Sequence, residues 1–301
     1  MTKSILVVDN NRTFRTFLTS LLRKEGHTVH EAGDGVAALD ILQDLRPDVV
    51  FVDLIMPGIG GDHLCRIIRR LPQLTACRVV VVSAAAAEFD FDHREVGADA
   101  CIAKGPFHTT AFYIREVLRE LGEGAKTDPL QKIYGRKGLR SRGITRELLA
   151  KTERLESILD GVSEGILEIA RDRVVYANRT ALEWLAIPVE SLLGRTVPAV
   201  LEGALYRLST SGGPREVEMA LNDRWLAIRC LSARESGVDV LLFTDITRRR
   251  EETLARKRLE DELRQQTLEL EAASERFRRE TERRRQAEET LRSNQQHPRR
   301  P

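Results

Sequence analysis

Apolar residues along the first 121 positions come in short runs that alternate with amphipathic stretches. Five of these runs are rich in Val, Ile or Leu and predict strands at Ser4–Asp9, His27–Glu31, Asp48–Asp53, Arg78–Ser83 and Asp99–Ala103. Between them, apolar side chains recur at helical spacing over Phe14–Leu22, Val36–Leu42, Leu64–Leu71, Glu88–Val96 and Phe112–Leu121. Strands that alternate with helices form parallel sheets covered on both faces, so residues 1–121 are predicted to be an α/β doubly wound domain.

The pattern changes over residues 147–247. Leu148, Leu155 and Leu159 predict an initial helix. Five short strands are then expected, with helices between the second and the third, at Gly165–Ala170, Arg173–Ala177, Arg215–Leu221, Arg224–Ala233 and Val238–Thr244. Antiparallel strands around a helical insertion predict an α+β domain.

Residues 248–293 contain neither proline nor glycine and predict one long helix. Leu263, Leu270 and Phe277 share one heptad position, and Leu259 and Ala273 share the other. These two heptad positions together form an apolar seam along the helix. Gln266, Glu280 and Arg284 interrupt this seam. We interpret it as a coiled coil, with a single solvated charged helix as the alternative, and expect a disordered tail at 294–301.

Charge and cysteine content narrow the functional classes. The chain has 48 basic and 46 acidic residues, and its aromatic content is 5%, which disfavours a broad nucleic-acid surface. Residues 122–146 have seven basic and two acidic residues and are expected to be a basic flexible linker. The four cysteines form no CxxC pair, no apolar run is long enough to span a membrane, and no signal peptide is recognisable. We therefore expect a reduced, cytoplasmic protein.

Polar residues lie at the carboxyl ends of four predicted strands of the first domain: Asp9-Asn10, Asp53, Ser83 and Lys104. The carboxyl ends of parallel strands meet at one edge of a sheet, where α/β proteins bind their ligands. Carboxylate and amide oxygens suit Mg²⁺, which keeps several waters and accepts phosphate oxygens. The sequence therefore predicts a site at this edge that binds magnesium and phosphate.

The segments ILVVDNNRTFR, DVVFVDLIMPGIGGDHL, VVVVSA and GADACIAKGPF resemble the receiver domain of two-component response regulators, a flavodoxin-like fold. The resemblance implies that Asp53 accepts a phosphoryl group from a partner histidine kinase or phosphotransfer protein. It further implies that Mg²⁺ is bound by Asp53, Asp9, Asn10 and the backbone carbonyl of Ile55. Lys104 would neutralise phosphoryl oxygens, and Ser83 would donate a hydrogen bond to the phosphorylated form.

Three positions depart from the usual receiver pattern. Asn10 replaces the second of two adjacent acids, so one negative charge is missing and we expect weaker Mg²⁺ binding. Cys101 stands where the family has its switch aromatic, which makes Ser83 and Cys101 the candidate switch residues. Gly105 separates Lys104 from Pro106, which are adjacent in the family's usual Lys-Pro pair.

The stretch Gly60–Leu64 superficially resembles the signature of cyclic-dinucleotide synthases. Such an enzyme domain needs far more chain around its motif than the receiver-like loop provides. We interpret the stretch as a turn followed by a helix that Asp62 caps.

The segments ILDGVSEGILEIARDRVVYANRTALEWLAIPVESLLGRTV and LLFTDITRRRE resemble a PAS domain with an N-terminal helix, over residues 147–247. Asn178 follows the second strand as in many PAS domains, and either a helix cap or a ligand contact would explain it. All six histidines lie outside this region, so a His-ligated haem is disfavoured. No cysteine follows Asn178 in the manner of cysteinyl-flavin relatives, and the PAS ligand is left unassigned.

The leading hypothesis is a two-component phosphorelay protein whose phosphorylated receiver acts through PAS and coiled-coil interactions. A homodimer through the PAS N-terminal helix and the coiled coil is expected. No complete kinase, cyclase or NTPase domain is recognisable, so we do not expect an enzyme beyond receiver phosphorylation and dephosphorylation. One alternative is the receiver–PAS front of a histidine-kinase system with catalytic domains on another chain. A second is a DNA-binding regulator that uses the Arg-rich helix.

Overall fold

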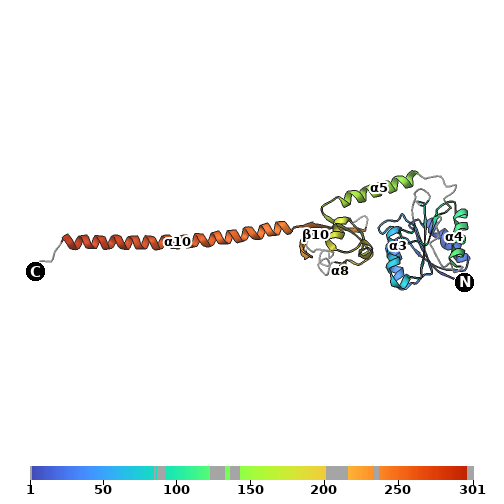
Figure 1. Cartoon of the computed structure of the whole chain (residues 1–301), viewed down its shortest axis with the longest axis horizontal. Coiled ribbons are helices and arrows are strands. Elements are labelled where there is room, and N and C mark those ends of the chain that lie inside the picture. The colour runs from blue at the N-terminus through green and yellow to red at the C-terminus, as the bar shows by residue number, and fades with distance from the viewer. Residues whose placement is uncertain are drawn as a thin grey trace. The chain divides into compact units, whose positions relative to one another are not determined.

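The computed structural model describes residues 2–84, 86, 93–122, 133–135, 143–200, 216–233 and 237–296 (Figure 1). The chain divides into two compact units, Met1–Asp245 and Ile246–Pro301. The first unit contains two separate β-sheets, and the second contains a long helix.

The first sheet is entirely parallel and has the order β2-β1-β3-β4-β5-β6. Its strands are β1 (Ser4–Val8), β2 (Thr28–Ala32), β3 (Val49–Val52), β4 (Arg78–Ser83), β5 (Ala100–Ala103) and β6 (Ile133–Tyr134). The first five coincide with the predicted strands to within one or two residues, and the prediction of an α/β doubly wound domain is confirmed. The sixth was not predicted.

Alternate residues of each strand serve the two faces of this sheet. Ile5 and Val7 pack in one buried cluster, whereas Leu6 and Val8 pack in the other. The first cluster includes side chains of α1 (Arg12–Lys24) and α4 (Phe107–Gly122), and the second includes side chains of α2 (Gly35–Asp44) and α3 (Gly61–Arg70). A short 3₁₀ turn, η1 (Pro72–Leu74), follows α3. Both faces are covered, which accounts for the nearly continuous apolar strands.

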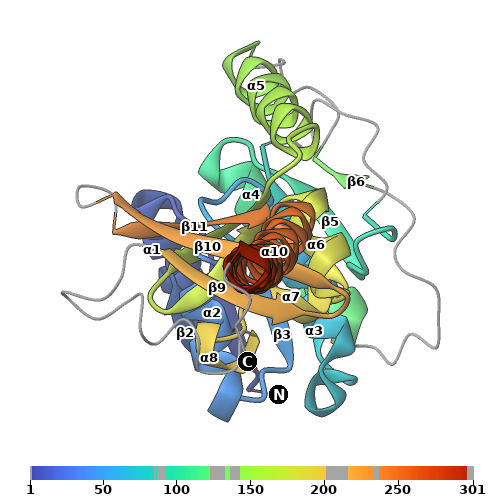
Figure 2. The same ribbon diagram turned by 90° about the vertical axis from the view of Figure 1, so that its left-hand side faces the viewer.

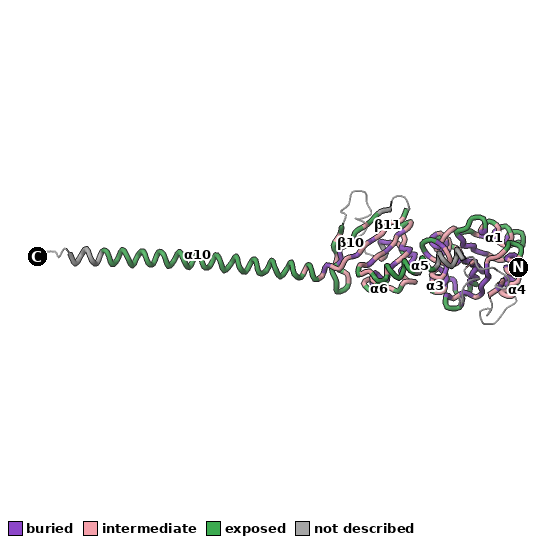
Figure 3. The backbone as a smooth tube through the Cα atoms, turned by 90° about the horizontal axis from the view of Figure 1, so that it is seen from above, coloured by how far each residue is buried: buried purple, intermediate pink, exposed green. Residues whose placement is uncertain are grey.

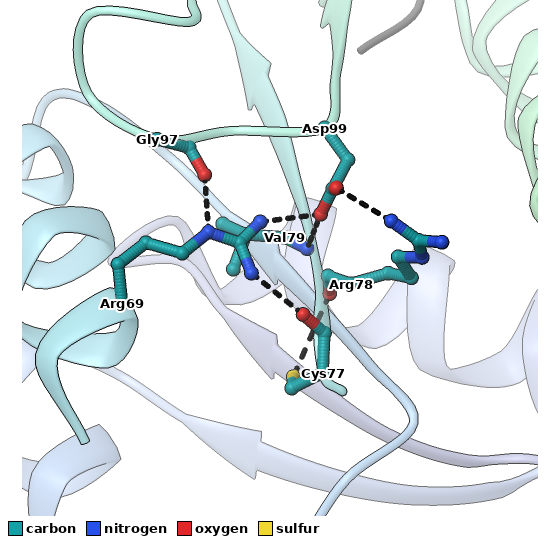
Figure 4. A network of polar contacts seen from close by, with 6 residues as sticks. All are labelled: Arg69, Cys77, Arg78, Val79, Gly97 and Asp99. Carbon is teal, nitrogen blue, oxygen red and sulfur yellow. Dashed lines mark hydrogen bonds and ion pairs between the residues drawn. The ribbon is translucent and has the colours of Figure 1, made fainter. Parts of the chain in front are cut away.

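A polar network ties the amino-terminal ends of β4 and β5 to the last turn of α3 (Figure 4). The Arg69 guanidinium donates to the carbonyl oxygens of Gly97 and Cys77 and to the Asp99 carboxylate. Asp99 also accepts from Arg78 at 3.0 Å and from the backbone N–H of Val79 at 2.7 Å. These bonds satisfy both carboxylate oxygens at the sheet edge opposite the predicted site.

Two expectations about local structure are wrong, and a third is partly outside the described residues. Residues 122–146 are not wholly a solvated linker, because Tyr134 of β6 is 2% exposed and pairs with the sheet. Helix α3 begins earlier than expected: its N-cap is Gly60, and Asp62 lies in the first turn instead of capping it. Of the helix expected over Glu88–Val96, residues 88–92 lie outside the described residues, and residues 93–96 form a turn.

The second sheet is antiparallel and has the order β8-β7-β11-β10-β9; β9, β10 and β11 lie side by side in Figure 2. Its strands are β7 (Gly165–Ala170), β8 (Arg173–Ala177), β9 (Glu216–Leu221), β10 (Arg224–Ala233) and β11 (Val238–Asp245). Helix α5 (Gly143–Asp160) precedes the sheet, and α6 (Arg179–Leu185), α7 (Val189–Leu192) and α8 (Val197–Val200) follow β8. The predicted α+β domain is confirmed.

Asn178 links several elements around this second sheet. Its Oδ1 accepts from the backbone N–H of Ala181, which caps α6, and from that of Ile166 on β7. Its Nδ2 donates to the carbonyl oxygens of Leu159 and Glu164, both at 2.9 Å. The side chain is buried and makes four hydrogen bonds, so the capping interpretation accounts for this residue.

Helix α10 (Thr247–Gln296) has 50 residues. Every side chain from Glu251 to Glu289 is exposed in the single chain, including those of the heptad leucines (Figure 3). None of the described helices is long and apolar enough to cross a membrane.

Candidate functional site

Asp53 follows β3 at the carboxyl edge of the parallel sheet. Its backbone N–H donates to the carbonyl oxygen of Val8 at 3.0 Å, which fixes it beside the end of β1. The side chain is 9% exposed. Gly61 allows the loop to approach closely, since a Cβ at this position would lie 1.9 Å from the Asp53 carbonyl oxygen. The carboxylate is therefore held almost buried, on a tightly packed loop.

Lys104 reaches this carboxylate from the end of β5. Its Nζ lies 2.6 Å from Oδ2 of Asp53 and 2.7 Å from Oδ2 of Asp9. It also lies 4.6 Å from the centroid of the Phe14 ring, where a cation is attracted to the aromatic face. The ammonium group thus bridges the two acids and offsets part of their charge.

Asp9 is the more deeply buried of the two acids, with a residue exposure of 2%. Its Oδ1 accepts from the backbone N–H of Asn11 at 2.8 Å. Burial raises the pKa of Asp9 above its usual value, while Lys104 opposes that rise. Charges interact more strongly in a low dielectric than in water, so the burial of Asp9 strengthens the attraction between its carboxylate and the Lys104 ammonium.

The other predicted residues lie at the same edge but differ in exposure. Asn10 is exposed, next to the buried Asp9. The backbone N–H of Ile55 lies 3.5 Å from Oδ1 of Asp53, which places this loop against the carboxylate. Ser83 is buried at the end of β4, and its carbonyl oxygen accepts from the backbone N–H of Lys104 at 3.0 Å.

Cys101, the second candidate switch residue, is buried within β5. Burial raises the pKa of its thiol to about 12. The thiol is therefore protonated at neutral pH and acts as a small apolar side chain.

The chemistry of the donors fits a magnesium ion held with several of its own waters. Asp9 and Asp53 would supply carboxylate oxygens, and Asn10 and the Ile55 carbonyl would supply neutral oxygens. Among the described residues, no group of three or more His, Cys, Asp or Glu side chains could hold a metal ion. Two carboxylates suit Mg²⁺, which is often bound by one or two of them together with phosphate oxygens.

Two residues of the site were not predicted from the sequence. The pattern places Phe14 on the apolar face of a helix, whereas its contact with Lys104 depends on how α1 packs against α4. Gly61 was assigned to a turn, and its need for a hydrogen side chain follows from the approach to Asp53. Neither contact has a signal in the local sequence pattern.

Residues 5–112 match the response regulator receiver domain, and residues 153–217 match a PAS domain. The chain carries a receiver domain followed by a PAS domain. The receiver match spans the parallel sheet from β1 to β5 and contains Asp9, Asp53 and Lys104. Receiver domains take part in phosphorelay signalling, are phosphorylated by histidine kinases and bind Mg²⁺. They carry no kinase or cyclase domain of their own.

Curated relatives share part of the chain. The DNA-binding response regulator MtrA of Mycobacterium tuberculosis is 44% identical over 69 residues, which is 23% of this chain and 30% of that protein. The transcriptional regulatory protein AfsQ1 of Streptomyces coelicolor is 35% identical over 128 residues, or 42% of this chain and 55% of that protein. The chain thus matches less than two thirds of the length of either relative.

Solved receiver structures are also similar. The response regulator TrrA of Thermotoga maritima, solved in complex with Mg²⁺-BeF, is 26% identical, with a TM-score of 0.36. That similarity covers 40% of this chain and 99% of TrrA. The chemotaxis response regulator CheY4 of Vibrio cholerae is 24% identical, with a TM-score of 0.37 and the same two coverages.

Proposed function

We propose that this chain accepts a phosphoryl group on Asp53 from a partner histidine kinase or phosphotransfer protein. The observation that carries the proposal is the Lys104 ammonium, which lies within 2.7 Å of both Asp9 and Asp53. An anionic transition state gains most from a fixed positive charge in a partly dry site. A strand-end carboxylate beside such a charge is suited to phosphoryl transfer.

In the transfer step, a lone pair of the Asp53 carboxylate attacks the phosphorus of a phosphohistidine. The O–P bond forms as the P–N bond breaks, and the imidazole nitrogen keeps the electron pair and takes up a proton. Lys104 then pairs with a phosphoryl oxygen, and Ser83 donates a hydrogen bond to the acyl phosphate. Asp9, Asn10, Asp53 and the backbone carbonyl of Ile55 would hold Mg²⁺, which when bound would supply further positive charge for the phosphoryl oxygens.

The test uses the full chain incubated with acetyl phosphate and Mg²⁺. The wild type should become phosphorylated, and Asp53→Ala should not. Asp44→Ala is a matched control, because Asp44 is an exposed aspartate of the same domain and should leave labelling unchanged. Equal labelling of wild type and Asp53→Ala, or labelling of neither, would refute the assignment.

For the output we propose protein–protein interaction through the PAS domain and a homodimeric coiled coil. The heptad side chains Leu259, Leu263, Leu270 and Phe277 are 64–73% exposed in the single chain, so a second copy would bury them. This proposed output does not depend on which ligand, if any, the PAS domain binds.

The relative MtrA is a DNA-binding response regulator, which makes DNA binding a second candidate. The arginines of α10 weigh against its use as a basic DNA-binding helix: Arg248, Arg256 and Arg284 each contact a glutamate four positions away. Such pairs neutralise the positive charge that phosphate binding requires. Salt-sensitive binding to duplex DNA in a gel-shift assay would favour the second candidate, and no shift at low salt would exclude it.

A further inference from the structure

Strand β6 lies outside the matched receiver segment and closes the outer edge of its sheet. Ile133 pairs in parallel with Cys101, and Tyr134 pairs with Ile102. Among the residues that the structure describes, β6 and β5 share two registered pairs, whereas each other neighbouring strand pair of this sheet has four or five. The strand is therefore the one with the fewest ladder contacts among the described strands of the sheet.

Side chains anchor this short strand on both faces. Tyr134 is 2% exposed; its hydroxyl donates to the Glu120 carboxylate, and its ring centroid lies 6.1 Å from that of Tyr113. Burial and Glu120 raise the pKa of the Tyr134 phenol, so it remains a donor at neutral pH. On the other face, Ile133 packs against the apolar cluster that contains Cys101. Both anchors contact elements of the receiver.

Gly135 ends the strand with a left-handed backbone conformation, at φ 78°. A Cβ here would lie 3.0 Å from the Tyr113 ring and 3.4 Å from the carbonyl oxygen of Ala103. A larger residue would therefore be strained in conformation and crowded by these two neighbours. The side chains of Ile133 and Tyr134 and the backbone conformation of Gly135 thus match the contacts available at this edge of the sheet.

Strand β5, with which β6 pairs, ends immediately before Lys104 of the candidate site. Cys101 and Ile102, the partners of β6, precede Lys104 by three and two residues. When Asp53 carries a phosphoryl group, the Lys104 ammonium must exchange an Asp53 oxygen for a phosphoryl oxygen that lies farther from the Asp53 backbone. This movement of the Lys104 side chain displaces the carboxyl end of β5. Because β6 pairs with β5 over two residues, its pairing is the first to be lost.

We propose that Ile133–Gly135 is a strap that reports the state of the receiver: it pairs with β5 when Asp53 is unmodified and is released on phosphorylation. This rests on the proposed phosphorylation of Asp53. Since Cys101 replaces the family's switch aromatic, the strap gives the receiver an output that does not need an aromatic side chain to swing.

Hydrogen–deuterium exchange read by mass spectrometry tests the strap in the full chain. Acetyl phosphate and Mg²⁺ should speed exchange across 133–135 about tenfold, equivalent to about 1.4 kcal/mol of lost protection. Asp53→Asn should show no change. The mass of the intact protein, measured on the same sample, reports phosphorylation. An unphosphorylated wild type defeats the proposed function and the strap together, whereas a phosphorylated wild type with equal or slower exchange defeats the strap alone.

A second variant tests the anchor itself. Tyr134→Ala should exchange quickly at 133–135 with or without acetyl phosphate, and should still be phosphorylated because Asp53 and Lys104 are intact. Arg119→Ala, which removes an exposed side chain from the same helix as Tyr113, should retain wild-type protection at 133–135. Wild-type protection in Tyr134→Ala would overturn the assignment of Tyr134 as the anchor.

Discussion

The Nζ of Lys104 lies 2.6 Å from Oδ2 of Asp53, although these residues follow strands β5 and β3, which are separated by β4. The long lysine side chain spans the intervening strand and reaches Asp9 as well, at 2.7 Å. Three residues that are far apart in the sequence thus meet at one edge of the sheet. The chemistry we assign to the receiver depends on this meeting.

Replacing the lysine with a neutral chain of similar length should therefore slow phosphorylation more than it affects folding. Lys104→Met should lower the rate of labelling by acetyl phosphate by about 100-fold, the usual effect of losing one preorganised electrostatic group. Initial rates on a phosphate-affinity gel would measure this, with circular dichroism as the control for folding. Labelling of Lys104→Met at the wild-type rate would show that the ammonium plays no part.

Restoring the missing acid should strengthen magnesium binding. Asn10→Asp adds a carboxylate to the candidate ligand set, and we expect about tenfold tighter Mg²⁺ binding. Calorimetric titration of Mg²⁺ would measure it. Asn11→Asp is the matched control: it adds the same charge one residue away, and Asp can keep the helix cap that Asn11 provides. Equal affinities in the two variants would remove Asn10 from the ligand set.

The raised pKa of Asp9 predicts how stability depends on pH. A folded state that binds this proton more tightly than the unfolded state is favoured below the ordinary value of 3.8, and this contribution is lost as pH rises through the raised pKa. Asp9→Asn cannot titrate, so its free energy of unfolding should increase relative to wild type over that window. Urea unfolding at a series of pH values provides the measurement. A difference that does not change with pH would contradict the prediction.

The homodimer is tested by two leucines with similar exposure on one helix. Leu263 lies on the heptad seam, whereas Leu268 lies on the opposite side of the helix; they are 65% and 60% exposed. Leu263→Glu should weaken the dimer, because it places a charge in the seam, and Leu268→Glu should not. Light scattering after size-exclusion chromatography gives the mass of each. Equal masses for the two variants would argue against this seam.

Much of the fold could be predicted because the sequence signals are local. Five apolar runs defined five of the six strands of the first sheet, and the polar residues after Val8, Val52 and Ala103 marked the carboxyl ends of three of them. Parallel topology then placed Asp9, Asp53 and Lys104 on one edge without any further information. The gap between the strands predicted at Gly165–Ala170 and Arg173–Ala177 leaves Arg171 and Asp172 for a tight turn, and both residues have positive φ.

The rest depends on contacts between distant segments. Strand β6 was missed because Ile133 and Tyr134 are two apolar residues in a basic stretch, and their strand conformation comes from β5 and α4. The start of α3 was misplaced because Gly61 must lie against the Asp53 backbone, which carries the helix back to Gly60. Neither constraint can be read from the neighbouring residues alone.

The most direct test of the central claim is peptide mass spectrometry of the full chain after incubation with acetyl phosphate and Mg²⁺. We predict a phosphoryl adduct on the peptide that contains Asp53, lost when Mg²⁺ is chelated before the incubation and absent from Asp53→Ala. An adduct elsewhere in wild type, or none at all, would contradict the account.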